Sequence, residues 1–423
     1  MNTKRFLKTA LGAMMLTVFL APLVQAQDYR REGRGSLREI KKSFTVGAQG
    51  TLEMREVNGD ITVTAGAGTT VEILESLRIE VYTEEEAKRV MQACEDSYSQ
   101  TGNRISVDGT MRPRRSVESR FSITVPATFT LDLSTQGGDI SVDRVKGNTT
   151  LRTSGGDIML LSTGGIVNAK TSGGDVVVRD AEGTVDAKTS GGDLELERIK
   201  GRLDATTSGG NITLRSADKE VNLRTSGGDI EILEVAGNVI ASTSGGDVQV
   251  ENTSGSVDVS TAGGDLVLRD IKGELEAATS GGDIRAERLH AASRLKTSGG
   301  DIVVRALMAS LEAATSGGNV EVEMTLTDFK KPHGIALSSS GGDIELVIPD
   351  KLPAKIFAEI YLESKWGWGE RYDISSDFAL KIERGEGERR SAQYIRGEGD
   401  INGGGDPITL RTSAGNIAIR KGR

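Results

Sequence analysis

The sequence predicts an all-β protein, a parallel β-solenoid (β-helix) with 18-residue coils, capped by an N-terminal β-rich region with one helix and a C-terminal β region. Three observations indicate this fold. A Thr-Ser-Gly-Gly-Asp motif, or a close variant, starts every 18 residues from Thr135 to Thr315. Apolar residues recur at fixed positions inside each unit. The 423 residues include 54 Gly but only 4% aromatics, too little bulky material for a large conventional core.

The first 26 residues (1–26) are predicted to be a secretory signal peptide. Lys4, Arg5 and Lys8 precede an apolar run, and small residues stand before a cleavage point at Gln27. The apolar run is short for a membrane span, and a charged segment follows it directly. We therefore expect export to the periplasm, the outer cell envelope or the extracellular space, with no transmembrane helix after cleavage.

Charge and cysteine content exclude several classes of function. The formal net charge is −9, and removal of the three basic residues of the signal peptide takes it to −12. Such an acidic protein is repelled by phosphates, so nucleic acid is not expected as a partner. A single Cys excludes an internal disulfide framework and a Cys-based zinc site.

Residues 27–130 are predicted to form an N-terminal β-rich cap with a helix near residues 83–98. Thr83 and Glu86 have the spacing of a capping box. The apolar residues that share one face of this helix are Ala87, Val90, Met91 and Cys94. Cys94 is therefore interpreted as a buried core residue rather than a nucleophile. The cap is expected to cover the first coil, because an open solenoid end exposes unpaired backbone groups.

Residues 131–348 are predicted to form the solenoid. Apolar residues stand five and seven positions after the start of each motif, as in Ile158 and Leu160, and a residue that is mostly polar separates them. This is the periodicity of a strand with one buried face. A second pair, such as Val185 and Ala187, completes two short strands per unit. Consecutive coils are expected to pair as parallel strands about 4.8 Å apart, whereas a β-propeller needs about 40 residues per blade.

Three weaker copies extend the series. The segment NGDITV at residues 58–63 is predicted to be a degenerate first copy. A further copy starts at Ser339 after a longer insertion, and a divergent one starts at Thr412. The solenoid is thus expected to reach into both end regions.

Each motif is interpreted as a structural corner. The Gly pair is expected to supply a positive φ or a close backbone approach, and the Thr hydroxyl to bond along the stack. Stacked carboxylates repel by roughly 1 kcal/mol in water. The preferred offset is an Asx-type turn, in which each Asp accepts an N–H of its own corner. Calcium is the alternative, with few ligands per coil. The candidate calcium column is Asp157, Asp175, Asp193, Asp229, Asp247, Asp265, Asp283 and Asp301.

Residues 349–423 are predicted to form a C-terminal β cap that contains aromatic residues, whereas no Phe, Trp, Tyr, Pro or Cys occurs between Phe129 and Phe329. The aromatics either pack on the last coils or form an exposed patch for a protein or a glycan. The candidate contact residues are Tyr361, Trp366, Trp368 and Tyr372.

No catalytic site and no cofactor are predicted, with calcium kept as the alternative. His290 and His333, the only histidines, are interpreted as solvated loop residues, and the sequence has no G-x-S-x-G, H-E-x-x-H or P-loop motif. A polysaccharide-cleaving β-helix is the enzymatic alternative. The long face, however, offers no aromatic platform for sugar rings.

The chain resembles the bacterial putative-adhesin family of β-strand-repeat proteins, an exported domain of unknown function. The resemblance rests on the GGDI-type turns, on SITVPATFTLDLSTQGGDISV at residues 122–142 and on GGGDPITLRTSAGNIAIR at residues 403–420. It implies a β-solenoid at the cell envelope, suggests adhesion to a surface protein or a glycan, and defines no catalytic residues. The function predicted is therefore a non-catalytic adhesin or envelope scaffold, with a calcium-stabilised solenoid and a glycan-directed protein as alternatives.

Overall fold

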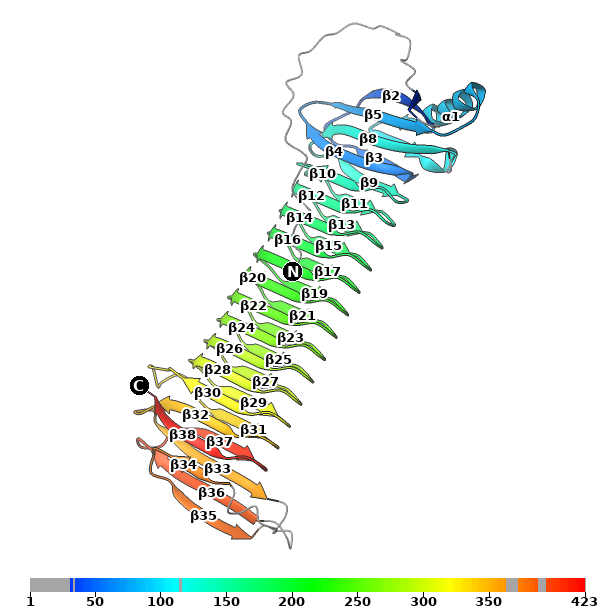
Figure 1. The fold of residues 1–423 in the computed structure, drawn as a ribbon. Coiled ribbons are helices and arrows are strands. Elements are labelled where there is room, and N and C mark those ends of the chain that lie inside the picture. The colour runs from blue at the N-terminus through cyan, green and yellow to red at the C-terminus, as the bar shows by residue number, and fades with distance from the viewer. Residues whose placement is uncertain (1–30, 33–34, 114–115, 363–371, 387–392, 423) are drawn as a thin grey trace.

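The computed structural model describes residues 31–422 except 33–34, 114–115, 363–371 and 387–392. It is a long stack of coils with the N-terminal strands and one helix at one end and a strand-rich segment at the other (Figure 1). The two helical elements of the described chain are α1 (Glu84–Asp96) and the 3-10 turn η1 (Gly109–Met111). The predicted signal peptide lies outside the described residues.

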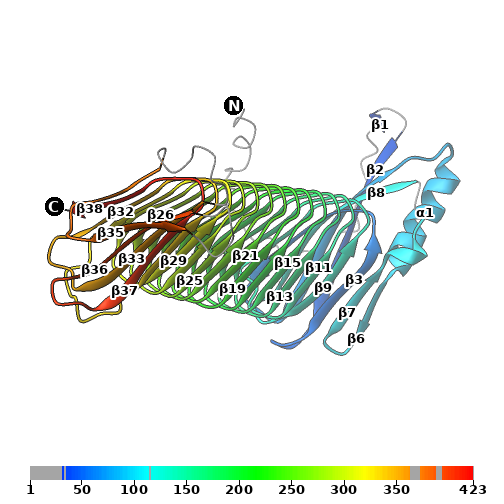
Figure 2. The same cartoon turned by 90° about the horizontal axis from the view of Figure 1, so that it is seen from below.

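Two long sheets form the opposite walls of the stack (Figure 2). Sheet A comprises β1 (Arg31–Glu32), β2 (Gly35–Thr45), β4 (Gly59–Gly66), β5 (Thr70–Ile79), β8 (Val117–Pro126), β10 (Ile140–Asp143), β12 (Ile158–Thr163), β14 (Val176–Ala181), β16 (Leu194–Ile199), β18 (Ile212–Ala217), β20 (Ile230–Val235), β22 (Val248–Thr253), β24 (Leu266–Ile271), β26 (Ile284–Leu289), β28 (Ile302–Leu307), β30 (Val320–Met324), β32 (Ile344–Pro349), β34 (Ile374–Ser376) and β38 (Ile417–Gly422).

Sheet B comprises β3 (Thr51–Val57), β6 (Tyr98–Thr101), β7 (Arg104–Asp108), β9 (Thr130–Thr135), β11 (Thr149–Arg152), β13 (Val167–Lys170), β15 (Val185–Lys188), β17 (Leu203–Thr206), β19 (Val221–Arg224), β21 (Val239–Ser242), β23 (Val257–Ser260), β25 (Leu275–Ala278), β27 (Ser293–Lys296), β29 (Leu311–Thr315), β31 (Ile335–Ser339), β33 (Ala354–Leu362), β35 (Lys381–Glu386), β36 (Gln393–Ile401) and β37 (Asp406–Thr412).

Consecutive coils pair in parallel and in register, which confirms the predicted solenoid. Ile158 of β12 lies opposite Val176 of β14, one coil later in the chain, and β13 pairs with β15 in the same way. The degenerate first copy also belongs to the stack, because Ile61 of β4 lies opposite Ile140 of β10. The 18-residue spacing therefore translates directly into strand register.

The core is a narrow set of stacked apolar columns. Ile158 and Leu160 from sheet A face Val167 and Ala169 from sheet B, and their exposed fractions are 0–2%. Small and medium side chains suffice because the two walls are close together. The large buried aromatics, Phe121 and Phe129, lie at the N-terminal end, before the regular coils begin.

A residue with a positive φ, within or directly after each sheet A strand from β10 to β28, bends the chain toward the next wall. Pairing between β12 and β14 skips from Leu161 and Arg179 to Thr163 and Ala181, because the residue between has a positive φ. The residues of this column, with φ of 54–70°, are Arg144, Ser162, Asp180, Arg198, Ser216, Glu234, Asn252, Asp270, Arg288 and Ala306. None is Gly, although this conformation costs other residues about 1–2 kcal/mol. The bend turns the following residue, such as Ala181, back into the core.

The N-terminal region continues both sheets and adds antiparallel strands. β8 pairs in parallel with β4 and in antiparallel with β5, and β5 pairs with β2. Helix α1 packs on this layer through Ala87, Val90 and Cys94. The helix begins after Thr83, whose Oγ1 accepts the Glu86 N–H at 3.1 Å. Burial raises the pKa of the Cys94 thiol to about 11, which keeps it a neutral core residue.

A buried ion pair lies under this helix. Glu75 is fully buried and Arg112 nearly so, and their side chains form two hydrogen bonds. The Tyr98 and Ser119 hydroxyls donate to the Glu75 carboxylate, each at 2.6 Å. Arg112 Nε donates to Ser97 Oγ at 2.9 Å. All the polar atoms of the pair thus have partners, as burial of charge requires.

At the C-terminal end, the chain passes the position of the next coil and then returns to fill it. Strand β37 lies between β31 and β33, because Ile408 is opposite both Ile335 and Ile356. Likewise β38 lies between β32 and β34. The copy at Thr412 therefore forms a coil inside the stack, and the antiparallel strands β36 and β35 lie beyond β33.

Candidate functional site

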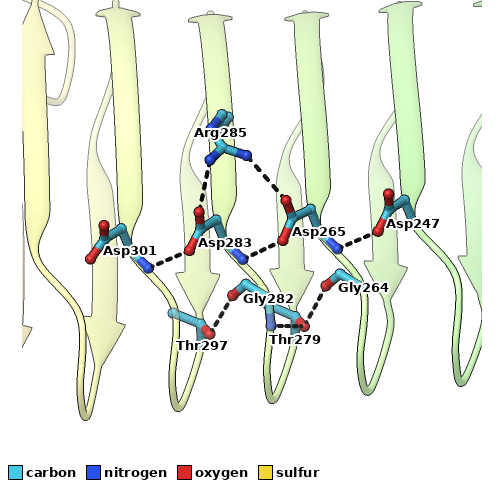
Figure 3. Close-up of polar contacts among 9 residues, drawn as sticks. All are labelled: Asp247, Gly264, Asp265, Thr279, Gly282, Asp283, Arg285, Thr297 and Asp301. Carbon is cyan, nitrogen blue, oxygen red and sulfur yellow. Dashed lines mark hydrogen bonds and ion pairs between the residues drawn. The ribbon is translucent and has the colours of Figure 1, made fainter.

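The acidic column of the repeat forms a ladder of hydrogen bonds along the solenoid. The Asp283 backbone N–H donates to Asp265 Oδ1 at 2.8 Å, and the Asp265 N–H donates to Asp247 Oδ1 at 2.7 Å (Figure 3). Asn211 and Asn319 occupy the same column and take part through the same atoms. The predicted Asx-type turn is therefore wrong, because the Oδ1 atom of each side chain accepts a backbone N–H of the next coil rather than one of its own corner.

The second carboxylate oxygen of this column faces outward. Arg285 bridges two of these oxygens, at 3.2 Å from Asp265 Oδ2 and 2.7 Å from Asp283 Oδ2 (Figure 3). Within the described residues, no group of three or more His, Cys, Asp or Glu side chains is placed to hold a metal ion. One oxygen of each carboxylate in the column thus accepts a backbone N–H, and the other remains at the surface.

The Thr of each motif makes two bonds of opposite direction. Thr279 Oγ1 donates to the Gly264 carbonyl of the preceding coil at 2.9 Å and accepts the Gly282 N–H of its own coil at 3.3 Å. The same pattern recurs from Thr153 to Thr315 and at Ser339, and Thr412 Oγ1 donates to the Gly342 carbonyl. The predicted bonding of Thr along the stack is confirmed.

The two Gly residues of the motif have different roles. A Cβ added to Gly282 would lie 2.0 Å from the Gly264 carbonyl oxygen, whereas one added to Gly281 would make an ordinary contact at 3.4 Å. Neither has a positive φ. Only the second Gly is required sterically, and the reason is close approach of adjacent coils.

Two of the four candidate contact residues, Tyr361 and Tyr372, lie within the described residues. Trp366 and Trp368 lie outside the described residues. Tyr361 is half-buried on the outer face of β33, directly opposite Tyr394 of β36. Tyr372 precedes β34, a strand of sheet A, and packs against the main core. Tyr361 is therefore on sheet B, whereas Tyr372 lies next to a strand of sheet A.

Tyr361 belongs to an aromatic patch on the outer face of the C-terminal strands, which we define as Phe357, Tyr361 and Tyr394. The Arg396 guanidinium lies 4.3 Å from the Tyr394 ring centroid, and Arg411 lies 5.6 Å from that of Phe357. These distances are within the range of cation–π contacts. The patch was only partly evident from sequence, because Phe357 and Tyr394 are 37 residues apart and reach the same face, on either side of Arg396, only through the pairing of β33 with β36.

Both Arg residues of the patch also approach one carboxylate. Arg396 Nη2 lies 2.7 Å from Glu359 Oε1, and Arg411 Nε lies 3.8 Å from Glu359 Oε2. The Glu359 hydrogen bond raises the pKa of Arg396, so this guanidinium stays charged. The net charge of these three groups, Arg396, Arg411 and Glu359, is therefore +1.

The two histidines have different surroundings. His290 is exposed at a coil corner, as predicted. His333 is only 4% exposed, and the prediction of a solvated residue is wrong for it. Its Nδ1 and Nε2 lie 2.8 and 2.9 Å from the carbonyl oxygens of Lys331 and Pro353. His333 thus ties the insertion before the last copies to the C-terminal strands.

None of the helices in the described residues is both long and apolar enough to span a membrane. A comparison with curated proteins found no match. Two solved structures are similar to this chain. One is a putative adhesin from Bacteroides fragilis, at 14% identity and a TM-score of 0.17, covering 73% of this chain and 97% of that one. The other is a putative cell adhesion protein from Clostridium sporogenes, at 8% identity and a TM-score of 0.15, covering 91% of this chain and all of that one.

The family comparison covers most of the chain. The profile of one family matches twice in tandem, over residues 52–238 and 234–420. The two matches meet inside the regular coils, where strand register continues without interruption. The chain belongs to the Toastrack DUF4097 family, whose fold is a β-solenoid.

Proposed function

We propose that the protein is a non-catalytic exported protein of the cell envelope, an adhesin or partner-binding scaffold whose rod of coils carries contact surfaces. The observation that carries this proposal is how the repeated polar residues are used. The Asp and Thr columns bond from coil to coil, and the second Gly of each motif permits the same stacking. The most regular polar groups of the chain thus build the rod, and the remaining outward side chains are available for contacts.

The rod also provides reach. Ten coil spacings of about 4.8 Å separate the first regular motif from the eleventh, a span of roughly 48 Å. Such a spacer holds a contact surface at one end away from whatever holds the other end. The two similar solved structures are a putative adhesin and a putative cell adhesion protein, and these names agree with the proposed function.

Fractionation of native cells tests export and location together. We expect a mature chain that begins at Gln27 by mass spectrometry, found in the envelope fraction and cleaved when protease is added to intact cells. A full-length chain in the cytoplasm would reject export. A processed chain that only broken cells expose to protease would reject adhesion and retain a periplasmic scaffold.

A glycan-binding function is the second candidate, and the aromatic patch of Phe357, Tyr361 and Tyr394 favours it. Aromatic rings flanked by guanidinium groups provide stacking surfaces and hydrogen-bond donors for sugars. On a glycan array, we expect the double variant Tyr361→Ala and Tyr394→Ala to lose binding. Tyr82→Ala is the control, because Tyr82 is 92% exposed at the other end of the chain. Binding that survives the double variant would exclude the patch.

A further inference from the structure

A shallow groove of about 710 Å³ runs along the outer side of sheet B. It crosses the coils of β21, β23, β25, β27, β29 and β31, which lie side by side in the rod (Figure 1). The first residue of each of these strands forms the floor of the groove, with its side chain buried in the core: Val239, Val257, Leu275, Ser293, Leu311 and Ile335. Five coil spacings of about 4.8 Å give it a length of roughly 24 Å.

The groove exists because side chains become small along one column. This column is the residue directly before each sheet B strand. In the coils before the groove it is Arg202 and then Glu220. Farther along it is mostly small: Ser256, Ala292, Ser310 and Gly334. At the near end of the groove Ile240 is 38% exposed, an unusual position for a large apolar side chain on this rod. The surface is therefore hollowed and partly apolar.

Three carboxylates in the middle of the groove lack the cationic partners found elsewhere on the rod. Asp258 and Glu276 lie opposite each other in adjacent strands, and Glu274 is in the same coil as Glu276. None of the three forms an ion pair with another described residue, whereas Glu312 and Glu220 at the two sides pair with Arg294 and Arg202. Adjacent carboxylates repel one another, so this part of the groove favours a cationic occupant.

We propose that the groove binds an extended, basic segment of a partner polypeptide, in which Lys or Arg alternates with small apolar residues. An extended chain rises about 3.3 Å per residue, so a groove of roughly 24 Å accommodates about seven residues. Apolar side chains of the segment contact the exposed groove residues Ile240, Ala292 and Ala336. The long stems of Lys or Arg reach the carboxylates on the walls while their charged ends stay hydrated. This inference goes beyond the proposed function, because it assigns a partner chemistry whatever the cellular location.

Binding of the fluorescently labelled octapeptide (Lys-Val)₄ to the purified chain tests the proposal by anisotropy. We expect saturable binding at low ionic strength that weakens as salt rises. The triple variant Asp258→Asn, Glu274→Gln and Glu276→Gln should bind about tenfold more weakly, because three charge contacts are lost. The peptide (Glu-Val)₄ should not bind.

A charge-matched variant separates groove binding from general attraction to an acidic protein. Asp218→Asn, Glu231→Gln and Glu345→Gln remove the same charge outside the groove, and none of these residues forms an ion pair with another described residue. We expect this variant to bind as the unmodified chain does. Equal weakening by both triple variants, equal binding of both peptides, or no binding of (Lys-Val)₄ at low salt would overturn the proposal. Thermal melting checks that both variants remain folded.

Discussion

The regular coils and the N-terminal cap stabilise the same molecule in opposite ways. In the regular coils, the Thr of each repeat motif makes two hydrogen bonds, the motif Asp accepts one from the next coil, and no aromatic side chain occurs. In the cap, Glu75 and Arg112 form one buried ion pair. Tyr98 and Ser119 donate hydrogen bonds to Glu75, and Arg112 donates one to Ser97. The rod therefore distributes its stability over many equal contacts, whereas the cap concentrates it in one cluster.

This difference teaches where a single substitution matters. A repeat in which every coil contacts only its neighbours loses one local set of contacts when one residue changes. A buried charge that loses its partner has no such reserve, because the remaining charge stays desolvated. The following substitutions range from the largest expected effect to the smallest.

The substitution Glu75→Ala should have the largest effect, a loss of about 3–5 kcal/mol in the free energy of unfolding of the cap, because Arg112 is left buried without its partner. Cys94, the single cysteine, provides a local probe. Its thiol is buried and its pKa is raised to about 11, so thiol labelling at pH 8 should be slow in the native chain and faster in the variant. Arg294→Ala, which breaks an exposed pair in the rod, should cost less than about 1 kcal/mol. Equal effects of the two would contradict the comparison.

Alanine at the second Gly of a corner should have the next largest effect. In Gly228→Ala, the new Cβ would lie 2.0 Å from the Gly210 carbonyl oxygen, so the coils must separate locally, at a cost of about 1–3 kcal/mol. Gly227→Ala is the matched control one residue away, where the nearest atom is 3.5 Å distant. We expect it to be neutral or to stabilise by about 0.4–1 kcal/mol. Urea unfolding of both variants measures the difference, and a destabilising Gly227→Ala would refute the steric explanation.

Two buried Thr residues of the same coil should respond differently to Val. Thr243 Oγ1 donates to the Gly228 carbonyl at 2.8 Å, so Thr243→Val should cost about 1 kcal/mol. The Thr253 hydroxyl is buried and has no hydrogen-bond partner among the described residues. Thr253→Val should therefore be neutral or stabilising, because it removes an unsatisfied polar group. Melting temperatures that fall equally in both would show that the coil-to-coil bond contributes nothing.

The smallest effect is expected for Asp247→Asn. The amide keeps the oxygen that accepts the next N–H, as Asn211 does naturally, so stability should change by less than about 0.5 kcal/mol. Asp247→Ala removes the acceptor and should cost about 1 kcal/mol. Calcium at millimolar concentration should leave the melting temperature of both variants and of the parent unchanged. A calcium-dependent rise that Asp247→Asn reduces would restore the calcium interpretation.

Sequence periodicity was sufficient to predict the regular coils, because residues one repeat apart in the chain pair with each other in a solenoid. Ile158 and Val176 are 18 residues apart and adjacent in space. The bend residue escaped prediction, since Ser162, Asp180 and Arg198 share a conformation but no chemistry. The direction of the Asp bonds also could not be predicted, because an Asx-type turn and a coil-to-coil ladder require the same residues.

The candidate site depended on non-periodic contacts and was harder to predict. Tyr361 was identified from sequence, but its neighbours Tyr394 and Arg396 come from a strand that folds back beside it. His333 is buried because the carbonyl oxygens of Lys331 and Pro353 enclose its ring. No local pattern in the sequence specifies either arrangement. The acidic groove likewise becomes apparent only when columns from six coils are placed side by side.

The returning C-terminal strands impose an order on folding. Stacked coils can form one after another as the chain becomes available, each on the template of the last. Strands β37 and β38, however, belong between β31 and β33 and between β32 and β34, and they are the last strands of the chain. The layer that joins the rod to β33 is therefore missing until residues 406–422 arrive. Completion of the C-terminal end must be a late event, and a chain that stops before Asp406 would leave two sets of strand edges without partners.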